Sequence, residues 1–461
     1  MATPRFAPVL LAVCVATGCG RSVDQDAFEQ ALGPALKRHA GTVQDRTVTA
    51  AVRAFYEQRN HQPAWTDDDA VDDAVAVMAA SSAHGLIPGD YDGPSLSTAF
   101  EAVEKSAAKD QARAEELANF DVRMTAALLR LGRDVAIGRV SPDVVGAQWK
   151  PRLTPSDLAA SLGTAVNGDE VSTWVDAIAP RHAGYKTLRK SLGKLQAATP
   201  TDDKKIAVVR MNLDRWRWLP SDLGQRHLIA NIPEFLLRAE ENGRTAFEMR
   251  VVVGGPGDRQ TPLFSDAMET VVFNPYWHIP QSIAQGETLP AIAKNPDYLE
   301  SHDIEVLDAA SGHRHVDPED VDWDDQDALK SLVFRQRPGD DNALGHVKFL
   351  FPNRHAVYMH DTPSTTFFQR PMRALSHGCV RVAEPEKLAG YVLRDQPTWT
   401  ATAISTTMGG DREQHVKLTH SLPVHLVYFT AAVNDRGELV FFDDVYKVDA
   451  KQLQAGQRPK V

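Results

Sequence analysis

A single cysteine in an unusual setting is the strongest chemical signal in the chain. Cys379 lies in the sequence LSHGCVR, directly after His377 and Gly378, and the other two cysteines, Cys14 and Cys19, lie near the N-terminus. Alanine or valine would fill a similar space, so packing alone gives little reason for a cysteine at position 379. A thiolate is a strong nucleophile, and this chemical role is therefore the favoured interpretation.

A histidine lies where it could serve this thiol. His360 ends an alternating apolar run before YMHDTP continues into a loop, and Cys379 follows that loop. The separation is too long for one helix face but suits two strands joined by a loop. A thiol nucleophile needs a nearby base or cation, and Gly378 allows a tight turn whose N–H groups face a developing oxyanion. The pattern predicts a catalytic pair; the alternative is a degenerate site that binds without reacting.

Composition sets the broad class. The 461 residues allow two or three domains, and 43% hydrophobic with 24% charged residues is typical of a soluble globular protein. The formal net charge is −11, and no basic stripe is present. These features argue against nucleic acid as a partner and against polybasic adhesion to a membrane surface.

The N-terminus has the features of an export signal. Arg5 precedes an apolar run over residues 7–16 that is too short to cross a bilayer. The run ends in ATGC, which resembles the lipobox of bacterial lipoproteins, in which the cysteine is lipidated. We therefore expect residues 1–19 to be a signal peptide and the protein to be periplasmic, anchored to the outer membrane through a lipid on Cys19. The alternative is ordinary signal cleavage nearby.

The residue pattern of the remaining chain changes once, near residue 200. Helical periodicity dominates before this point, and short β-rich segments follow it, beginning with KKIAVVRMNLDRWRWLP. The sequence therefore predicts an α+β fold, with an N-terminal α-helical scaffold domain followed by a mainly β catalytic domain. The expected boundaries are a tether at 20–45 with one possible helix at DAFEQALGPALKRHA, the helical domain at 46–200, the β-rich domain at 204–450 and a tail at 451–461. A polar, acidic insertion at 281–340 is expected to be an irregular lid.

The histidine followed by SHGC resembles the catalytic signature of the L,D-transpeptidases, the YkuD domain family, which crosslink peptidoglycan. MNLDRWRWLP, RVVVGGPGDRQTPLF and GHVKFLFPN are similar to the large Gram-negative, YcbB-like members. VRAFYEQRNHQPAW and HGLIPGDYD are similar to their scaffold domain. Two departures stand out: no peptidoglycan-binding domain fits before NLDRWRW, and Arg381 stands where the wider family often has asparagine, although the large members have arginine there.

The resemblance implies roles for the residues of the motif. Cys379 would be the nucleophile and His360 the base. The backbone carbonyl of Asp361 would orient the imidazole, and backbone N–H groups of Gly378 and Cys379 would form the oxyanion hole. His377, adjacent to this machinery, would either carry a proton or shape the loop.

Four further residues are candidates for substrate binding. Arg381 would hold a substrate carboxylate, with an internal salt bridge as the alternative. Ser376 would shape the loop and contact substrate. Tyr358 and Trp277 would line the groove, with core packing as the alternative for both.

The family's substrate is the tetrapeptide stem of peptidoglycan. Cys379 would attack the carbonyl of the third residue and expel the terminal D-Ala, and the third-residue amine of a second stem would resolve the thioester into a 3→3 crosslink. Water as acceptor would make the protein an L,D-carboxypeptidase, and an anchored protein's amine would attach that protein to the wall. A wall-binding scaffold with a silent site is the non-enzymatic alternative. The resemblance implies no metal or organic cofactor and predicts acylation by carbapenems.

Overall fold

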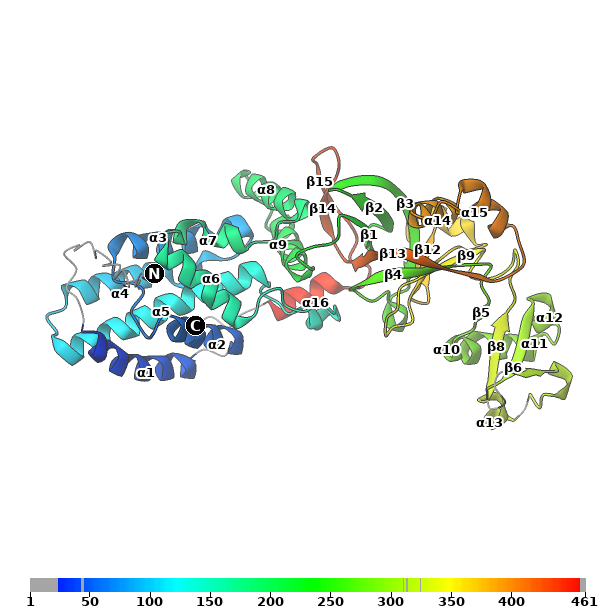
Figure 1. Cartoon of the computed structure of the whole chain (residues 1–461), viewed down its shortest axis with the longest axis horizontal. Helices are drawn as coiled ribbons and strands as arrows, with labels where there is room; N and C mark the ends of the chain where they lie inside the picture. The colour runs from blue at the N-terminus through cyan, green and yellow to red at the C-terminus, as the bar shows by residue number, and fades with distance from the viewer. Residues whose placement is uncertain (1–23, 43–44, 310, 312–313, 324, 457–461) are drawn as a thin grey trace, which may run out of the picture. The chain divides into compact units, whose positions relative to one another are not determined.

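The computed structural model describes residues 24–42, 45–309, 311, 314–323 and 325–456. The predicted signal peptide and the lipidation candidate Cys19 lie outside these residues. The chain divides into two compact units (Figure 1). The helical unit comprises residues up to Ile137 and Leu153–Ala179, and the β-rich unit comprises Gly138–Arg152 and the chain from Pro180 onward. The fold class is α+β, as predicted. Within the described residues, no helix combines the length and the apolar composition that a membrane span requires.

The helical unit is built around one long helix. Its helices are α1 (Gln25–Thr42), α2 (Arg46–Gln58), α3 (Asp68–Ala79), α4 (Gly93–Lys105), α5 (Asp110–Ala136), α6 (Pro155–Asn167) and α7 (Val171–Ile178). Helix α5 contacts α1, α2, α4, α6 and α7. The side chain of Asp45 caps α2 by accepting from the N–H groups of Thr47 and Val48, which satisfies two donors that have no partner inside the helix.

The prediction of a tether at residues 20–45 is wrong for the part that is described. Residues 25–42 form helix α1, which packs against α5. Phe28, Ala31, Leu32 and Ala35 are buried along one side of α1. Their spacing of three and four residues is that of an apolar helix face, so this segment belongs to the helical unit.

The segment KKIAVVRMNLDRWRW is also helical rather than a strand. Helix α9 (Asp203–Trp218) follows α8 (Ala183–Ala197), and both belong to the β-rich unit. Asp202 caps α9 by accepting from the N–H of Lys205. The buried residues Ile206, Val209 and Leu213 recur at helical spacing. The β-branched and aromatic residues suggested a strand, but their period fits a helix face.

The β-rich unit is organised by a sheet that closes on itself. The strands are β1 (Arg226–Asn231), β2 (Leu236–Glu241), β3 (Arg244–Gly254), β4 (Phe264–Phe273), β9 (Val347–Leu350), β10 (Met359–His360), β11 (Ala374–Ser376), β12 (Val380–Val382) and β13 (Gln414–Val427). Their order is β11-β3-β12-β10-β9-β4-β13-β1-β2, and an additional β2–β3 pairing completes the ring. Most neighbours are antiparallel, but β10 and β12 run parallel. A separate antiparallel hairpin with NDRG in its turn is formed by β14 (Ala431–Val433) and β15 (Leu439–Phe441).

Alternation along the strands separates the core from the opposite face. Fully buried apolar residues of the ring join one hydrophobic cluster with helices α14 (Pro385–Leu393) and α15 (Ala401–Met408). In strands β9, β10 and β12, the residues that belong to this cluster are Val347, Phe349, Met359, Val380 and Val382. Because successive side chains point to opposite faces, the residues between them project away from this core. The unit ends with helix α16 (Val448–Ala455), so residues 451–455, which were expected to be part of a tail, are ordered structure.

The segment predicted to be an irregular lid is instead a small subdomain with its own core. Strands β5 (Trp277–His278), β6 (Ile304–Asp308), β7 (Arg314–Val316) and β8 (Leu332–Gln336) form a four-stranded sheet in the order β5-β8-β6-β7. Short helices α10 (Gln281–Ile283), α11 (Leu289–Lys294), α12 (Tyr298–Ser301) and α13 (Gln326–Leu329) accompany it (Figure 1). Ile292, Leu299, Val306 and Phe334 share a buried cluster. We call residues 277–336 the inserted subdomain.

Candidate active site

The fold brings the predicted pair together on two neighbouring strands. Strand β10 ends at His360, and Cys379 immediately precedes β12, which runs parallel to β10. The register pairs His360 with Arg381, and the N–H of Val380 donates to the carbonyl of Tyr358 at 3.0 Å. Since register partners point to the same face, Tyr358, His360, Cys379 and Arg381 project together on the side opposite the core. This is the arrangement of two strands joined by a loop that the sequence predicted.

The imidazole of His360 is buried and held in one orientation. The side chain is 4% exposed, and its Nδ1 donates to the backbone carbonyl of Asp361 at 2.5 Å. A proton on Nδ1 leaves the lone pair of Nε2 free to accept one. Burial, and after it the positive charge of Arg381, lowers the pKa of His360 to about 3. The ring is therefore neutral near pH 7, the form in which it acts as a base.

Asp361, whose carbonyl orients His360, is itself held in place by hydrogen bonds to its side chain. The carboxylate of Asp361 accepts from the N–H of His346 at 2.9 Å and from the N–H of Thr362 at 2.7 Å. Gly345 has φ +58°, and a Cβ there would lie 2.3 Å from the Asp361 carboxylate. A larger residue at 345 would therefore displace the group that positions the imidazole. The sequence analysis missed this supporting layer.

Cys379 is a partly exposed thiol with several polar neighbours. Burial raises the pKa of Cys379, whereas hydrogen bonds from Tyr358 and the charges of Arg381 and Lys348 oppose this rise. The thiol is therefore the resting form, and its reaction needs a base. The ring of Tyr358 lies edge-on to that of His360, with centroids 5.6 Å apart. Tyr358 thus lies beside His360 on the face opposite the core, and its contact with substrate stays a prediction.

The loop that carries Cys379 is tied by its own side chains. The hydroxyl of Ser376 donates to the carbonyl of Cys379 at 2.5 Å and accepts from the N–H of Gly378 at 3.2 Å. Gly378 has φ +119°, a conformation that favours glycine, and Thr261 donates to its carbonyl at 2.8 Å. Ser376 is only 2% exposed. Its hydroxyl thus ties the loop at residues 378 and 379, and its contact with substrate stays a prediction.

These bonds also refine the predicted oxyanion hole. The N–H of Gly378 already donates to Ser376, so it is not free to meet an oxyanion in this arrangement. In the part of the chain that the structure describes, the N–H of Cys379 has no hydrogen-bond acceptor. The backbone donor of Cys379 itself is the one available beside the sulfur.

His377 faces away from this chemistry. Its Nε2 lies 2.9 Å from Glu287 of the inserted subdomain and 3.3 Å from the guanidinium of Arg259. A ring nitrogen engaged in this way is not placed to carry the thiol's proton. The structure therefore supports the loop-shaping alternative for His377 over a catalytic one, because His377 links the cysteine loop to the subdomain.

The two remaining candidates have different outcomes. The guanidinium of Arg381 lies 5.7 Å from the ring of Phe367, and within the described residues no carboxylate forms an ion pair with it. Arg381 is therefore available to a substrate carboxylate. Trp277 lies in β5 and packs against the core of the inserted subdomain. The partly buried indole thus contributes to the packing of this subdomain, and its place in a substrate groove stays a prediction.

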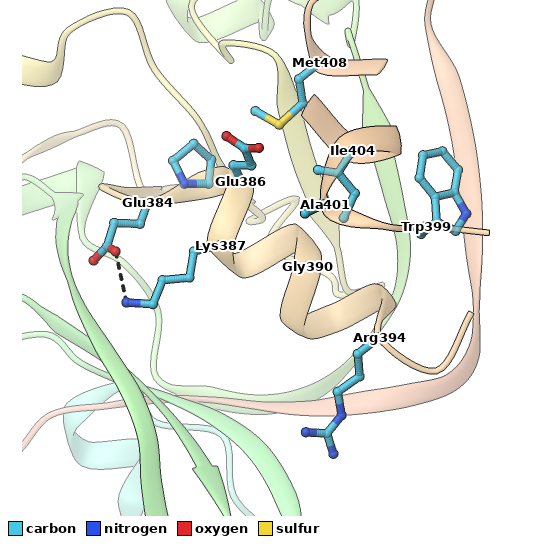
Figure 2. Close-up of a pocket in the computed structure, with 10 residues that line it drawn as sticks. Glu384, Glu386, Lys387, Gly390, Arg394, Trp399, Ala401, Ile404 and Met408 are labelled. Atoms are coloured by element: carbon cyan, nitrogen blue, oxygen red, sulfur yellow. Dashed lines mark hydrogen bonds and ion pairs between the residues drawn. The ribbon is translucent and has the colours of Figure 1, made fainter. Parts of the chain in front are cut away.

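One cavity of the β-rich unit does not coincide with this site. A cavity of about 800 Å³ lies between α14 and α15, where Figure 2 shows Lys387, Ile404 and Met408 at its wall. Neither Cys379 nor His360 lines it. The site is thus identified by its chemistry, and among the described residues no cluster of His, Cys, Asp or Glu is arranged to hold a metal ion.

Two buried histidines and one partly buried histidine of the β-rich unit predict a pH-dependent stability. Burial lowers the pKa of His182 and His425 to about 4 and that of His360 to about 3. An unfolded histidine has a pKa of about 6.5, so the unfolded chain takes up these protons first as the pH falls. The contribution of these histidines to the free energy of unfolding is therefore full above about pH 6.5 and is lost as the pH falls toward 4.

Urea unfolding measured from pH 7.5 to 4.5 tests this expectation. His425→Gln should flatten the dependence by up to about 1.4 kcal/mol per pH unit, the contribution of one proton. An identical slope in the variant and the unsubstituted protein would show that His425 does not contribute.

Comparisons with known proteins agree with this geometry. Residues 50–192 match the family model of a scaffold domain, and residues 225–407 match that of the YkuD L,D-transpeptidase catalytic domain, which includes both His360 and Cys379. A Haemophilus influenzae protein named "Putative L,D-transpeptidase" is 28% identical over 86% of this chain and 77% of its own length.

Two solved structures were also matched. An L,D-transpeptidase from Mycobacterium smegmatis is 12% identical, with a TM-score of 0.20 over 44% of this chain and 58% of its own. L,D-transpeptidase 1 of Mycobacterium tuberculosis is 13% identical, with a TM-score of 0.17 over 44% of this chain and 61% of its own. This chain thus spans less than two thirds of either protein, and the low scores add nothing to the family matches.

Proposed function

We propose that this chain, which belongs to the L,D-transpeptidases with a scaffold and a YkuD catalytic domain, joins peptidoglycan stems through a thioester on Cys379. The observation that carries the proposal is the neutral, oriented imidazole of His360 on the strand beside Cys379. The substrate is a tetrapeptide stem, and the product is a 3→3 crosslink. The protein acts in the periplasm, anchored through Cys19.

The first half of the reaction forms the thioester. His360 Nε2 takes the proton of the Cys379 thiol, and the sulfur attacks the carbonyl carbon of the stem's third residue. The N–H of Cys379 faces the oxyanion that forms. The bond to the terminal D-Ala then breaks, and the proton on His360 passes to the leaving amine.

The second half releases the product. The side-chain amine of a neighbouring stem's third residue attacks the thioester and passes a proton to His360. The carbon–sulfur bond breaks, and the sulfur recovers its proton from the imidazolium. Arg381, which has no carboxylate partner in the described residues, is placed to hold a carboxylate of the substrate bidentately.

Product analysis tests this function and separates it from its alternatives. The protein from residue 20 onward is incubated with purified tetrapeptide muropeptides, and the products are identified by mass spectrometry. New 3→3 dimers are expected. Tripeptides alone would mean that water is the acceptor, and the protein would then be an L,D-carboxypeptidase. No product from a folded protein would favour a wall-binding scaffold with a silent site.

Cys379 should also react with carbapenems. The β-lactam carbonyl is an acyl donor, and its ring opens when the sulfur attacks, so the intact mass rises by the mass of the whole inhibitor. Mass spectrometry of the protein after incubation should show this adduct on Cys379. Turnover of stems without any adduct would contradict carbapenem acylation but not the transpeptidase reaction.

The inserted subdomain is proposed to act as a lid on this site. The contact between His377 and Glu287 at 2.9 Å joins the subdomain to the loop that carries Cys379. Both side chains are partly exposed, so the pair itself contributes only about 0–1 kcal/mol. The proposed role of this contact is to position the subdomain over bound peptide.

Glu287→Gln should therefore raise KM for the stem peptide about twofold to fivefold with little change in stability, because the ion pair is weak. Glu319→Gln, on the same subdomain but without a recorded contact to the loop, is the matched control. Steady-state kinetics and thermal unfolding of both variants check the expectation. Equal KM values for the two variants would contradict a role of Glu287 in closing the lid.

A further inference from the structure

Lys348 is a charged residue in an otherwise apolar strand, and it lies beside the proposed base, His360. The register of β9 pairs it with His360 on β10 and with Val272 on β4. Its neighbours in β9, Val347 and Phe349, are fully buried in the core. Because side chains alternate, Lys348 projects to the opposite face, which is the face of His360 and Cys379.

The ammonium group of Lys348 lacks the partner that a desolvated cation normally has. Its Nζ lies 5.9 Å from the centroid of the Tyr358 ring, a weak cation–π contact. Burial lowers the pKa of Lys348. In the part of the chain that is described, no carboxylate forms a salt bridge with it. Keeping an unpaired amine in this position costs stability, and such groups are concentrated at functional sites.

The charges around Lys348 define what its ammonium can do. Across β10 it faces Tyr358 and His360, and the carboxylate of Glu413 is a further charge that acts on it. Beyond β10, Arg381 and Cys379 belong to β12 and its preceding loop. Val272, its partner on β4, is apolar, so Glu413 is the one acidic side chain that acts on Lys348 among these groups.

We propose that Lys348 is a positioning residue that, together with Arg381, stabilises negative charge on the sulfur of Cys379. This inference rests on the proposed nucleophilic role of Cys379. Two cations on the face of the sheet that carries the sulfur favour the thiolate over the thiol. The same charges disfavour the imidazolium form of His360, so the base stays ready to accept a proton.

The combined charges of Lys348 and Arg381 explain how a thiol whose pKa is raised by burial can react near neutral pH. Burial pushes the pKa of Cys379 upward, and the two cations and Tyr358 pull it back. Arg381 has a delocalised charge and a geometry suited to a substrate carboxylate. Once Arg381 is engaged by that carboxylate, Lys348 is the cation that remains for the sulfur.

The test measures the thiolate directly, without peptide substrate. The rate at which iodoacetamide alkylates Cys379 is followed from pH 6 to 10, with peptide mapping to separate Cys379 from the other cysteines. Lys348→Met keeps the length of the apolar stem and removes the charge. It should raise the apparent pKa of the thiol by about 0.5 to 1 and slow alkylation at pH 8 about threefold to tenfold.

Three further variants complete the design. Lys348→Arg should restore most of the alkylation rate, because it restores the charge, and Lys348→Gln provides a second neutral side chain if the methionine variant is unstable. Lys387→Met is the matched control, since Lys387 pairs with Glu384 on α14. A pH profile for both neutral variants that coincides with this control would overturn the proposal.

The readout separates this inference from the proposed function. A shifted alkylation profile in a protein that makes no 3→3 dimers would support the proposed role of Lys348 and contradict the proposed transpeptidase reaction. An unshifted profile in a protein that makes dimers would contradict the proposed role of Lys348 and support the proposed reaction.

Discussion

Cys379→Ala is expected to abolish the formation of 3→3 dimers, a loss of at least about 10⁴-fold, since no other side chain replaces a covalent nucleophile. Among the described residues, Cys379 is the one free cysteine. The alanine side chain fits the space that the thiol leaves, and the ties between Ser376 and the cysteine loop use backbone atoms of residues 378 and 379. Loss of activity should therefore occur without loss of the fold.

The control for this prediction is Ser405→Ala. Ser405 is an exposed residue on α15 and contributes only its backbone to the contacts recorded there. This variant should keep full activity, and both variants should unfold at the temperature of the unsubstituted protein. Dimers formed by Cys379→Ala would mean that the nucleophile is a different group.

His360→Gln is expected to lower kcat for dimer formation by about 10² to 10⁴, the usual contribution of a general base. Glutamine has a similar size but accepts no proton at neutral pH. Thiol deprotonation would then depend on solvent, while the cations near Cys379 would still stabilise the thiolate. Stopped assays analysed by chromatography of muropeptides would measure the loss.

The pH profile adds a second, independent test of His360. A base with a pKa of about 3 stays neutral throughout the range from pH 5 to 8. The activity of the unsubstituted protein should therefore show no acid limb near pH 6.5, the ordinary pKa of histidine. An acid limb at that pH which disappears in His360→Gln would contradict the buried, neutral base.

The placement of His360 and Cys379 on neighbouring strands could be predicted from sequence because its signal is local. An alternating apolar run that ends in a histidine, and a glycine before a cysteine, specify a strand end and a tight turn. The structure confirms both, with β10 ending at His360 and Gly378 at φ +119°. The predicted contact of Asp361 with the imidazole was equally local, because the two residues are adjacent.

The elements that were missed depend on partners far away in the chain. Helix α9 contains Ile206, Val209 and Leu213 at helical spacing, but its Val, Met and Trp residues also fit a strand. The structure resolves this ambiguity through distant contacts, including the ion pair between the buried Arg215 and Asp449 of α16. Such pairing is visible only once the helix has formed.

Trp277 and Lys348 show the same limit within the site. Sequence alone does not say which face each of these two side chains takes. The register of β5 with β8 assigns Trp277 to the inserted subdomain, and the register of β9 with β10 assigns Lys348 to the site. A lysine between Val347 and Phe349 was a usable signal, because a charged residue in a buried strand needs a reason.

Direct detection of the acyl-enzyme tests the central claim most closely. The protein is mixed with a tetrapeptide stem that lacks a free acceptor amine, quenched with acid within seconds, and digested for peptide mapping by mass spectrometry. We predict that the peptide containing Cys379 gains the mass of the tripeptide acyl group, with one equivalent of D-Ala released and no adduct in Cys379→Ala. Release of D-Ala with the peptide of Cys379 unmodified at every quench time, or an adduct on another residue, would contradict the proposed mechanism.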